Sequence, residues 1–426
     1  MIKAVLNRFK GSQMARNTSW MLFGNGIKTV VQAAYFVLIA RSLHSDGYGA
    51  FVGVCALVAI AFPFASLGFG NILIRNVARN ASSFGRYWGN TLLMTLISGG
   101  VLLLLVLAVA RFVLPASIPF SLIFIIAVTS LFFDTVHVIG AQAFQAVQRL
   151  HRTALLNVIP NIFRLIAIAG LSALVKSPSP LQWSCLYLAT GLICALIAGY
   201  LVNKELGPPV FTLKGMKADI LEGFYFSITL SSQNIYNDID KSMLTRLSSL
   251  SAVGIYAAAY RIIDVSFTPV RSLLAAVYAK FFQHGESGVR GSLRFAIKLI
   301  PFAGGYGFVA GIVLVLAAPL LPYVLGAEYA DAADALRWLS PLPFLKAVHF
   351  FAADTLTSAG YQGLRSGVQV FVAVFNAGIN LWLIPAYSWR GAAWSSIASD
   401  GLLAVLLWAV LLHISNKTNR LKMPRG

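Results

Sequence analysis

Runs of apolar residues long enough to cross a lipid bilayer recur along nearly the whole of this 426-residue chain. Each run holds about 20 residues, the length at which a helix spans the roughly 30 Å hydrocarbon core. Because that core offers no water to the backbone, a spanning segment must satisfy its own N–H and C=O groups, which a helix does. Composition agrees, since 58% of the residues are hydrophobic and 11% are charged, against about a quarter charged in soluble domains. The sequence therefore predicts an all-α polytopic membrane protein.

We expect about twelve transmembrane helices, arranged as two six-helix bundles related by pseudo-two-fold symmetry about the membrane normal. The expected helices cover residues 20–42, 47–70, 89–111, 117–141, 154–175, 181–202, 220–246, 252–280, 295–318, 337–359, 364–385 and 391–413. The first bundle occupies residues 1–202, and the second occupies residues 220–426 and ends in a basic cytoplasmic tail. A cytoplasmic linker, 203–219, joins them and contains Gly207 and Pro208.

Lysine and arginine are concentrated in alternate connections between the expected helices. The basic connections are the N-terminal segment, residues 71–88, 142–153, 203–219 and 280–298, and the C-terminal tail. The positive-inside rule then places both termini in the cytoplasm. The same distribution explains the net charge of +19 through topology and contact with anionic lipid headgroups, so we expect membrane lipids and no nucleic acid as partners.

Two short internal echoes support a repeat. The segment Arg41–Phe51, "RSLHSDGYGAF", matches Arg246–Tyr256, "RLSSLSAVGIY", at an offset of 205 residues. The segment Asn157–Asn161, "NVIPN", matches Asn376–Asn380, "NAGIN", at an offset of 219. Since each half begins on the cytoplasmic side, the repeat is parallel, about an axis normal to the membrane. It predicts two bundles with a cleft between them.

Familiar catalytic and metal-binding patterns are missing from the sequence. It contains no phosphate-binding P-loop, no H-E-x-x-H pair and no G-x-S-x-G elbow. The cysteines Cys55, Cys185 and Cys194 lie inside apolar runs, where their spacing suits neither a disulfide framework nor a metal site. We therefore expect a protein that is not an enzyme, with no catalytic residues, no metal and no cofactor.

Ionisable residues interrupt the apolar spans more often than lipid exposure allows. A charge near the bilayer centre costs roughly 2.5–3.5 kcal/mol on insertion scales, so such a residue faces a partner or a cavity. The ionisable residues in the spans are Lys28, Asp134, His137, Arg164, Asp238, Asp240, Lys241, Arg261, Asp264, Arg271, Lys346, His349, Asp354 and Asp400. Acidic and basic members balance, which predicts extensive pairing.

The stretch "NIYNDIDKSML", Asn234 to Leu244, is the densest of these interruptions. At about 100° per residue, its polar side chains occupy one helix face. They are Asn234, Asn237, Asp238, Asp240 and Lys241. This face predicts a wet cavity beside the seventh span. We expect Asp238 to pair with Lys241, and Asp240 to pair with Arg261 or Arg271.

Three more pairs lie three residues apart: Asp134 with His137, Arg261 with Asp264, and Lys346 with His349. A pair at this spacing can be an inward-facing bridge that only fixes helix packing, or it can carry substrate or a coupling ion. Both interpretations stay open for each pair. Lys28 and Arg271 lie near span ends, where snorkelling of the side chain to the interface is a further alternative.

Three segments resemble the polysaccharide biosynthesis (Wzx-type) flippases of the MOP exporter superfamily. They are "YNDIDKSML…VGIYAAAYRI" within Tyr236–Ile262, "LHSDGYGAF…SLGFGNILIRNVARN" within Leu43–Asn80, and "TSAGYQGLRSGVQVFVAVFNAGINLWLIPAYSWRGAAWSSIASD" over Thr357–Asp400. The resemblance covers nearly the whole chain. One departure is the Trp389–Arg390 pair, which stands where a glycine is common in the family and puts the turn geometry there in doubt.

The resemblance implies a flippase that moves polyprenyl-diphosphate-linked oligosaccharide units across the bacterial cytoplasmic (inner) membrane by alternating access, for O-antigen, capsule or exopolysaccharide. A diphosphate sugar head needs cations and hydrogen-bonding groups in a cavity. We expect these to be Lys28, Arg164, Asn234, Asn237, Lys241, Arg261 and Lys346, with Arg75 at the cytoplasmic entrance. Coupling to inward movement of H⁺ or Na⁺ would use Asp134, Asp238, Asp240 or Asp264. A polysaccharide polymerase or ligase is a further expected partner.

Two rival functions stay open. A multidrug antiporter for organic cations, of the same superfamily, would prefer an acidic cavity with few cations, whereas both signs occur here. An envelope polysaccharide polymerase or ligase would be an enzyme. It would need a sizeable outer loop with catalytic arginine or histidine, and the longest outer connection, roughly 319–336, contains neither.

Overall fold

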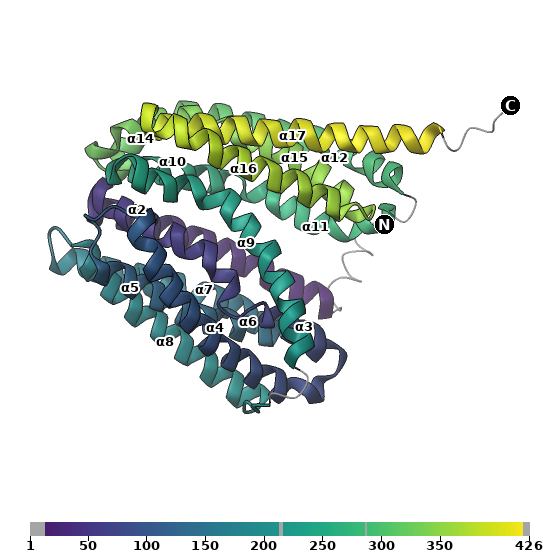
Figure 1. The fold of residues 1–426 in the computed structure, drawn as a ribbon, viewed down its shortest axis with the longest axis horizontal. Helices are drawn as coiled ribbons and strands as arrows, with labels where there is room; N and C mark the ends of the chain where they lie inside the picture. Colours follow the sequence, from purple (N-terminus) through teal and green to yellow (C-terminus); the bar gives the residue numbers. More distant parts are fainter. Residues whose placement is uncertain (1–12, 213–215, 286–287, 421–426) are drawn as a thin grey trace. The chain divides into compact units, whose positions relative to one another are not determined.

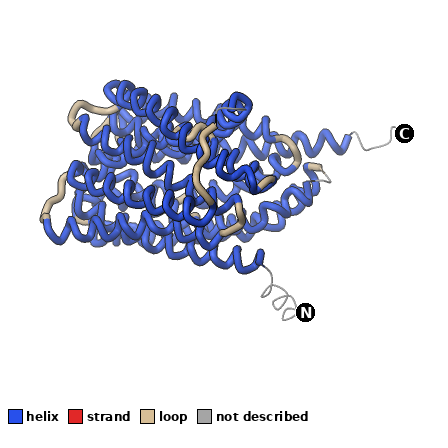
Figure 2. Tube along the Cα trace, turned by 90° about the horizontal axis from the view of Figure 1, so that it is seen from below, coloured by secondary structure: helices blue, strands red, loops and turns tan. Residues whose placement is uncertain are grey.

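The computed structural model describes residues 13–212, 216–285 and 288–420, and over these ranges the chain is helical and contains no strand (Figures 1 and 2). Most of the basic N-terminal segment, Lys214 in the linker and the end of the C-terminal tail lie outside the described residues. Packing divides the chain into two units, Met1–Arg246 and Leu247–Gly426. This grouping leaves α9 in the first unit. The division into bundles at 1–202 and 220–426 stays a prediction.

The described residues of the first unit form eight α-helices. They are α2 (Gln13–Ala61), α3 (Phe69–Arg79), α4 (Phe84–Val113), α5 (Phe120–Val128), α6 (Thr135–Ala146), α7 (Leu150–Leu174), α8 (Pro180–Leu206) and α9 (Met216–Leu247). A π-helical turn, Thr129–Asp134, joins α5 to α6, and short 3₁₀ turns at Phe62–Phe64 and Ala81–Ser83 flank α3. The long α2 is broken at His44, where φ is +58°, so it covers more than one expected span.

Side chains of α9 donate hydrogen bonds to backbone carbonyl groups at the end of α2. Pro63 has no N–H, so the carbonyl of Ala59 lacks its usual helical donor. The Asn234 side chain of α9 supplies one instead, with Nδ2 2.8 Å from the Ala59 carbonyl oxygen. Ser231 and Ser227 repeat this bond one and two turns earlier, to the carbonyls of Ile60 and Pro63 respectively. The break at Pro63 therefore anchors α9.

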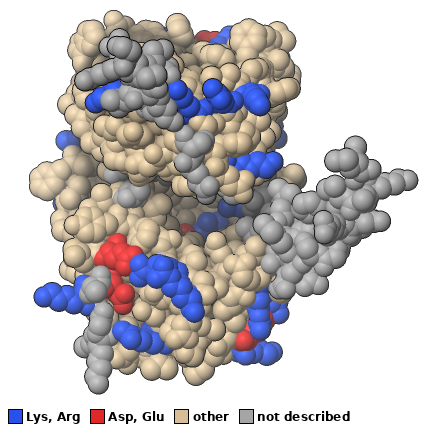
Figure 3. Space-filling model, turned by 90° about the vertical axis from the view of Figure 1, so that its right-hand side faces the viewer, with Lys and Arg blue, Asp and Glu red and all other residues tan. Residues whose placement is uncertain are grey.

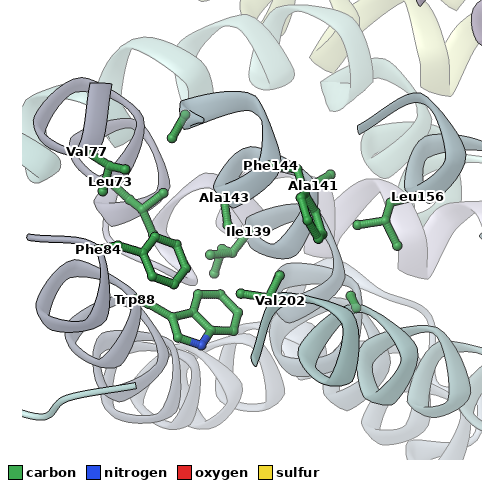
Figure 4. Packing of buried hydrophobic residues seen from close by; sticks show 12 residues of the cluster. Leu73, Val77, Phe84, Trp88, Ile139, Ala141, Ala143, Phe144, Leu156 and Val202 are labelled. Carbon is green, nitrogen blue, oxygen red and sulfur yellow. The ribbon is translucent and has the colours of Figure 1, made fainter. Parts of the chain in front are cut away.

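A buried hydrophobic cluster packs α3, α4, α6, α7 and α8 of the first unit against one another (Figure 4). Trp88 of α4 is fully buried and contacts side chains from α3, α6 and α8. Its indole N–H donates to Asn203 Oδ1 at 2.8 Å. Phe144 and Leu156, also fully buried, extend the cluster to α6 and α7. Burial of apolar side chains, with the one polar atom satisfied, fixes how these helices pack.

The second unit is built from eight further helices. They are α10 (Leu250–Ser266), α11 (Thr268–Gly285), α12 (Val289–Ala317), α13 (Leu321–Leu325), α14 (Ala330–Leu339), α15 (Leu342–Ser358), α16 (Gln362–Tyr387) and α17 (Trp389–Arg420). Its core joins α11, α12 and α15 around Phe281 and Phe351, both fully buried. α10 and α11 meet at an angle of 45°, next to the helix-breaking Pro269.

The expected count of twelve spans is not confirmed. Among the described residues, eight helices are long and apolar enough to cross a membrane, or nine if the bent α10–α11 pair forms one span. The apolar stretch Gly26–Arg79 covers two of the expected spans. α9 carries the charged stretch, and α15 has only 17 residues. The polytopic all-α class is confirmed, and the difference in number arises where helices are broken or charged.

Candidate functional site

A buried cation, a carboxylate and a tyrosine meet in the first unit. Arg164 of α7 donates from Nη2 to Asp134 Oδ1 at 2.6 Å. The Tyr187 hydroxyl of α8 donates to the other carboxylate oxygen at 3.0 Å. The guanidinium carbon of Arg164 lies 4.1 Å from the centre of the Tyr187 ring. The Arg164 and Asp134 side chains are only 16% and 18% exposed, so each charge depends on the other.

The π-helical turn positions this carboxylate. Asp134 is its last residue, and the wider backbone turn rotates the side chain away from the register of a continuous α-helix. Gly191 of α8 packs against the turn so closely that an added Cβ would lie 2.7 Å from the Thr129 methyl group. Single π turns of this kind are frequent at functional sites.

His137 does not pair with Asp134, so the pairing that the three-residue spacing predicted is wrong. Its Nδ1 lies 3.1 Å from the Cys194 carbonyl oxygen and its Nε2 lies 2.7 Å from that of Leu156. The ring thus bridges α6, α8 and α7, and the carboxylate finds a stronger partner in Arg164.

The charged stretch of α9 forms the pair that its spacing predicted. Lys241 Nζ lies 2.7 Å from Asp238 Oδ1, with the lysine side chain 11% exposed. The Asp240 carboxylate is buried and accepts from the Lys241 backbone N–H at 2.8 Å. Asn234 uses its amide donor within the unit, on the Ala59 carbonyl. The Asn237 side chain lies outside the described residues.

The second unit contains a comparable cluster around Lys346 of α15. Lys346 Nζ donates to the Tyr260 hydroxyl at 2.8 Å and lies 4.5 Å from the centre of that ring. Asp264 of α10 supplies the negative charge, with Oδ1 3.8 Å from Lys346 Nζ and 3.7 Å from Arg271 Nη2. The lysine side chain is 6% exposed and the aspartate 34%, so the acid is the more open partner.

Arg261 does not take Asp264 as its partner, which corrects the second predicted pair. It is half-buried on α10, and within the described ranges it forms no ion pair and no hydrogen bond. The bend after Ser266 turns Arg271 of α11 toward Asp264 instead. Arg261 is therefore the predicted substrate-binding cation whose charge is least compensated by the described part of the chain.

Two buried acids of the second unit have partners that the spacing did not predict. His349 Nε2 lies 3.0 Å from Asp400 Oδ1 of α17, with both side chains under 5% exposed. Asp354 meets Arg365 at 3.5 Å. His349 therefore does not pair with Lys346. Both contacts join residues on different helices, which a three-residue spacing cannot reveal.

The remaining predicted cations lie elsewhere in the first unit. Arg75 of α3 forms an ion pair with Glu222 of α9, and the two side chains are 33% and 38% exposed. Lys28 is half-buried on α2. The structure thus joins Arg164 to Asp134, Lys241 to Asp238 and Lys346 to Asp264, and it leaves Arg75 in a pair of its own.

A third internal repeat in the sequence contains Asp134 of the first cluster and Lys346 of the second. Phe132–His137, "FFDTVH", matches Phe344–His349, "FLKAVH", at an offset of 212 residues, between the offsets of the two other echoes. Asp134 and Lys346 occupy the same position of this segment. The tyrosines, in contrast, carry no sequence signal, because aromatic residues are common throughout the spans.

Comparison with known proteins identifies the family. A model of the polysaccharide biosynthesis protein family matches residues 14–279. The chain belongs to this family. No curated protein shows significant similarity to its sequence. The expected resemblance to Wzx-type flippases is confirmed at the level of the family.

The fold is shared with transporters of the MOP superfamily. The inward-facing conformation of a multidrug resistance MATE family transporter is 15% identical, with a TM-score of 0.76, and the match covers 93% of this chain and 96% of that one. The lipid II flippase MurJ, in an inward closed conformation, is 12% identical with a TM-score of 0.74, covering 92% and 87%. A MOP superfamily transporter from Pyrococcus furiosus is 15% identical with a TM-score of 0.61, covering 96% and 98%.

Proposed function

We propose that this protein is a flippase that translocates polyprenyl-diphosphate-linked oligosaccharide units from the inner to the outer leaflet of the bacterial cytoplasmic membrane. The observation that carries the proposal is Lys346, an ammonium group that is 6% exposed in a family member of polysaccharide biosynthesis. A buried cation among apolar helices is costly unless it serves a site. Its hydroxyl and ring partner, Tyr260, offers the hydrogen bonding and stacking that a sugar diphosphate uses.

The diphosphate would be bound by exchange of partners. Arg164, Lys241 and Lys346 each face a carboxylate, so an incoming phosphate replaces one anion with another and the cation stays paired. Arg261, which has no such partner within the described ranges, adds attraction without that competition. Lys28, Asn234 and Asn237 stay predicted substrate-binding residues.

This exchange has a consequence for ion coupling through Asp134, Asp238, Asp240 and Asp264. When a phosphate takes Arg164, the Asp134 carboxylate loses its ion pair in an apolar setting and binds H⁺ or Na⁺ more readily. Binding of the phosphate and binding of the cation at this cluster therefore favour each other. The membrane potential supplies part of the drive, about 2.3 kcal/mol per outward negative charge per 100 mV.

The topology that we propose has both termini in the cytoplasm. Lys and Arg side chains gather on the face shown in Figure 3, where Asp and Glu are few. This supports a cytoplasmic location of that face by the positive-inside rule. Polysaccharide polymerase or ligase partners would then act at the opposite side.

The function is tested by translocation in proteoliposomes that contain a polyprenyl-diphosphate-linked oligosaccharide. We expect wild-type protein to move it to the outer leaflet, and Arg261→Ala with Lys346→Met to reduce the rate at least tenfold. Trp382→Phe, at a side chain that is 69% exposed on α16, is the matched control and should leave the rate unchanged. Normal translocation by the stable double variant would contradict the assignment.

A multidrug exporter of organic cations is the second candidate, because the MATE fold is shared. A cationic drug needs an uncompensated carboxylate, whereas Asp134, Asp238 and Asp264 each have a basic partner. The same proteoliposomes distinguish the two functions. Uptake of a cationic dye that the lipid-linked oligosaccharide does not inhibit would favour the drug exporter.

A further inference from the structure

The first turns of α9 carry two acidic residues that face arginines of neighbouring helices. Glu222 forms an ion pair with Arg75 of α3. Burial raises the pKa of the Asp219 carboxyl, which precedes the expected seventh span, and the positive charges of Arg86 and Arg75 oppose that rise. The positive charges of Arg75 on α3 and Arg86 on α4 thus act on carboxylates of α9.

Backbone packing holds this end of α9 in place independently of the charges. Gly68 has a φ of +67°, and a Cβ atom there would collide with the Gly223 carbonyl oxygen, next to Glu222. The segment before α9 runs along the start of α4, where the Val210 N–H donates to the Gly85 carbonyl at 2.8 Å. The carboxylates therefore stay near the arginines even when the ion pair opens.

Three predicted substrate-binding cations of the first unit form ion pairs, and the Arg75–Glu222 pair is the most exposed of these. Its side chains are 33% and 38% exposed, against 16% and 18% for Arg164 and Asp134. Solvent screens an exposed pair, so its partners exchange easily. A buried pair holds its partners more strongly. An anion arriving from water would meet the exchangeable pair before it reached the buried one.

A diphosphate is a better partner for Arg75 than a carboxylate. It carries more charge, and its several oxygens can accept two N–H bonds from one guanidinium. Next to Arg75, the Asn76 side chain accepts from Arg75 Nε at 3.4 Å. Its own Nδ2 is buried and has no acceptor in the described part of the chain, so it offers a further donor.

We propose that Arg75, with Arg86 and Asn76 beside it, is a docking site for the diphosphate group, and that Glu222 and Asp219 of α9 occupy the site until the diphosphate displaces them. The identity of the natural ligand rests on the proposed function. The site itself rests on the contacts of Arg75 with Glu222 and Asn76, and on the charges of Arg86 and Asp219. Displacement would free the start of α9 from its ionic contact with Arg75. The close packing of Gly68 against Gly223 would still hold the helix in place.

Binding of inorganic pyrophosphate to the purified full-length protein, measured by calorimetry, tests the site. Glu222→Gln removes the competing carboxylate and should tighten binding about threefold, the worth of one exposed ion pair. Glu205→Gln is the matched control, because Glu205 pairs with Arg149 and Arg152 in the same unit, and it should leave binding unchanged. Arg75→Ala should weaken binding at least tenfold.

Arg75→Lys and Glu222→Asp keep the charges and replace the first variants if those do not fold. Both should bind pyrophosphate less tightly than Glu222→Gln does. Equal affinities for the Glu222 and Glu205 variants, or unchanged binding by Arg75→Ala, would overturn the site. Lack of pyrophosphate binding by wild-type protein would overturn it as well. If the pyrophosphate-binding results contradict the site while the oligosaccharide is still translocated, the site is wrong and the proposed function stands. The expected binding pattern without translocation would leave the site standing and refute the function.

Discussion

The two units carry the same short segment with opposite charges at its third position. In the first unit Asp134 stands there and receives its cation from α7; in the second Lys346 stands there and receives its carboxylate from α10. In both, the cation lies over a tyrosine ring, at 4.1 Å for Arg164 and 4.5 Å for Lys346. What the repeat retains is a compensated cluster of cation, carboxylate and tyrosine, because an isolated charge between apolar helices is costly.

The clusters differ in which charge is open. In the first unit the two partners are nearly equally buried, at 16% and 18% exposure. In the second, Lys346 is 6% exposed while Asp264 is 34% exposed and has Arg271 as a second cation. The first cluster is thus a pair in which both charges are buried, which we call the closed pair. In the second, the ammonium group is buried and the carboxylate is partly exposed. Substitutions in the two clusters should therefore differ in their cost to stability.

Breaking the closed pair should have the largest effect. Arg164→Gln leaves the Asp134 carboxylate with only the Tyr187 hydroxyl, and the loss of one partner of a buried pair costs about 3 kcal/mol of unfolding free energy. Lys346→Met should cost only about 1 kcal/mol, because Asp264 is a third exposed and keeps Arg271. Denaturant unfolding in detergent measures both.

The double variant Asp134→Asn, Arg164→Gln is the control for this comparison. It removes both charges, so it should recover most of the stability that Arg164→Gln loses. A double variant as unstable as the single one would show that Arg164 acts through packing and not through its charge.

Spacing along one helix predicted some of these contacts and failed for others. Asp238 and Lys241 pair as expected because both lie on the uninterrupted α9. Arg261 and Asp264 also share a helix, yet cations from α11 and α15 reach the acid. Contacts between helices depend on how the helices pack, and periodicity in one segment carries no information about its neighbour.

The segment Phe344–His349 shows how much a repeat can reveal about a site. Its match to Phe132–His137 places Lys346 and Asp134 at corresponding positions from the amino-acid sequence alone. The π turn that ends at Asp134 cannot be found in this way, because it depends on the close packing of Gly191 against Thr129. The polytopic helical class, in contrast, follows from composition and run length alone.

Removing the tyrosine hydroxyls should have an intermediate effect that is larger in the second unit. Tyr260→Phe deprives Lys346 of its closest oxygen, at 2.8 Å, and leaves the carboxylate at 3.8 Å. Tyr187→Phe removes one donor from Asp134, which keeps Arg164 at 2.6 Å. A hydrogen bond to a charged group contributes about 1.5–3 kcal/mol, so we expect about 2 kcal/mol for Tyr260→Phe and about 1.5 kcal/mol for Tyr187→Phe.

The same denaturant series checks this order, with Tyr200→Phe as the control at a side chain that is 62% exposed. An equal loss for Tyr187 and Tyr260, or a larger loss for Tyr187, would contradict the view that the second cluster relies on its tyrosine.

The smallest effects are expected for two pairs that share one spacing and differ in burial. Lys241–Asp238 in the first unit and Arg337–Asp334 in the second are both three residues apart, at 2.7 and 2.6 Å. The first lysine is 11% exposed, whereas both members of the second pair are close to half exposed. Asp238→Asn should therefore cost about 1 kcal/mol and Asp334→Asn at most about 0.3 kcal/mol. Raising the salt concentration should abolish the effect of Asp334→Asn and leave most of that of Asp238→Asn, because salt screens exposed charges far more than buried ones. Equal costs at both salt concentrations would mean that spacing, and not burial, decides what an ion pair contributes in this protein.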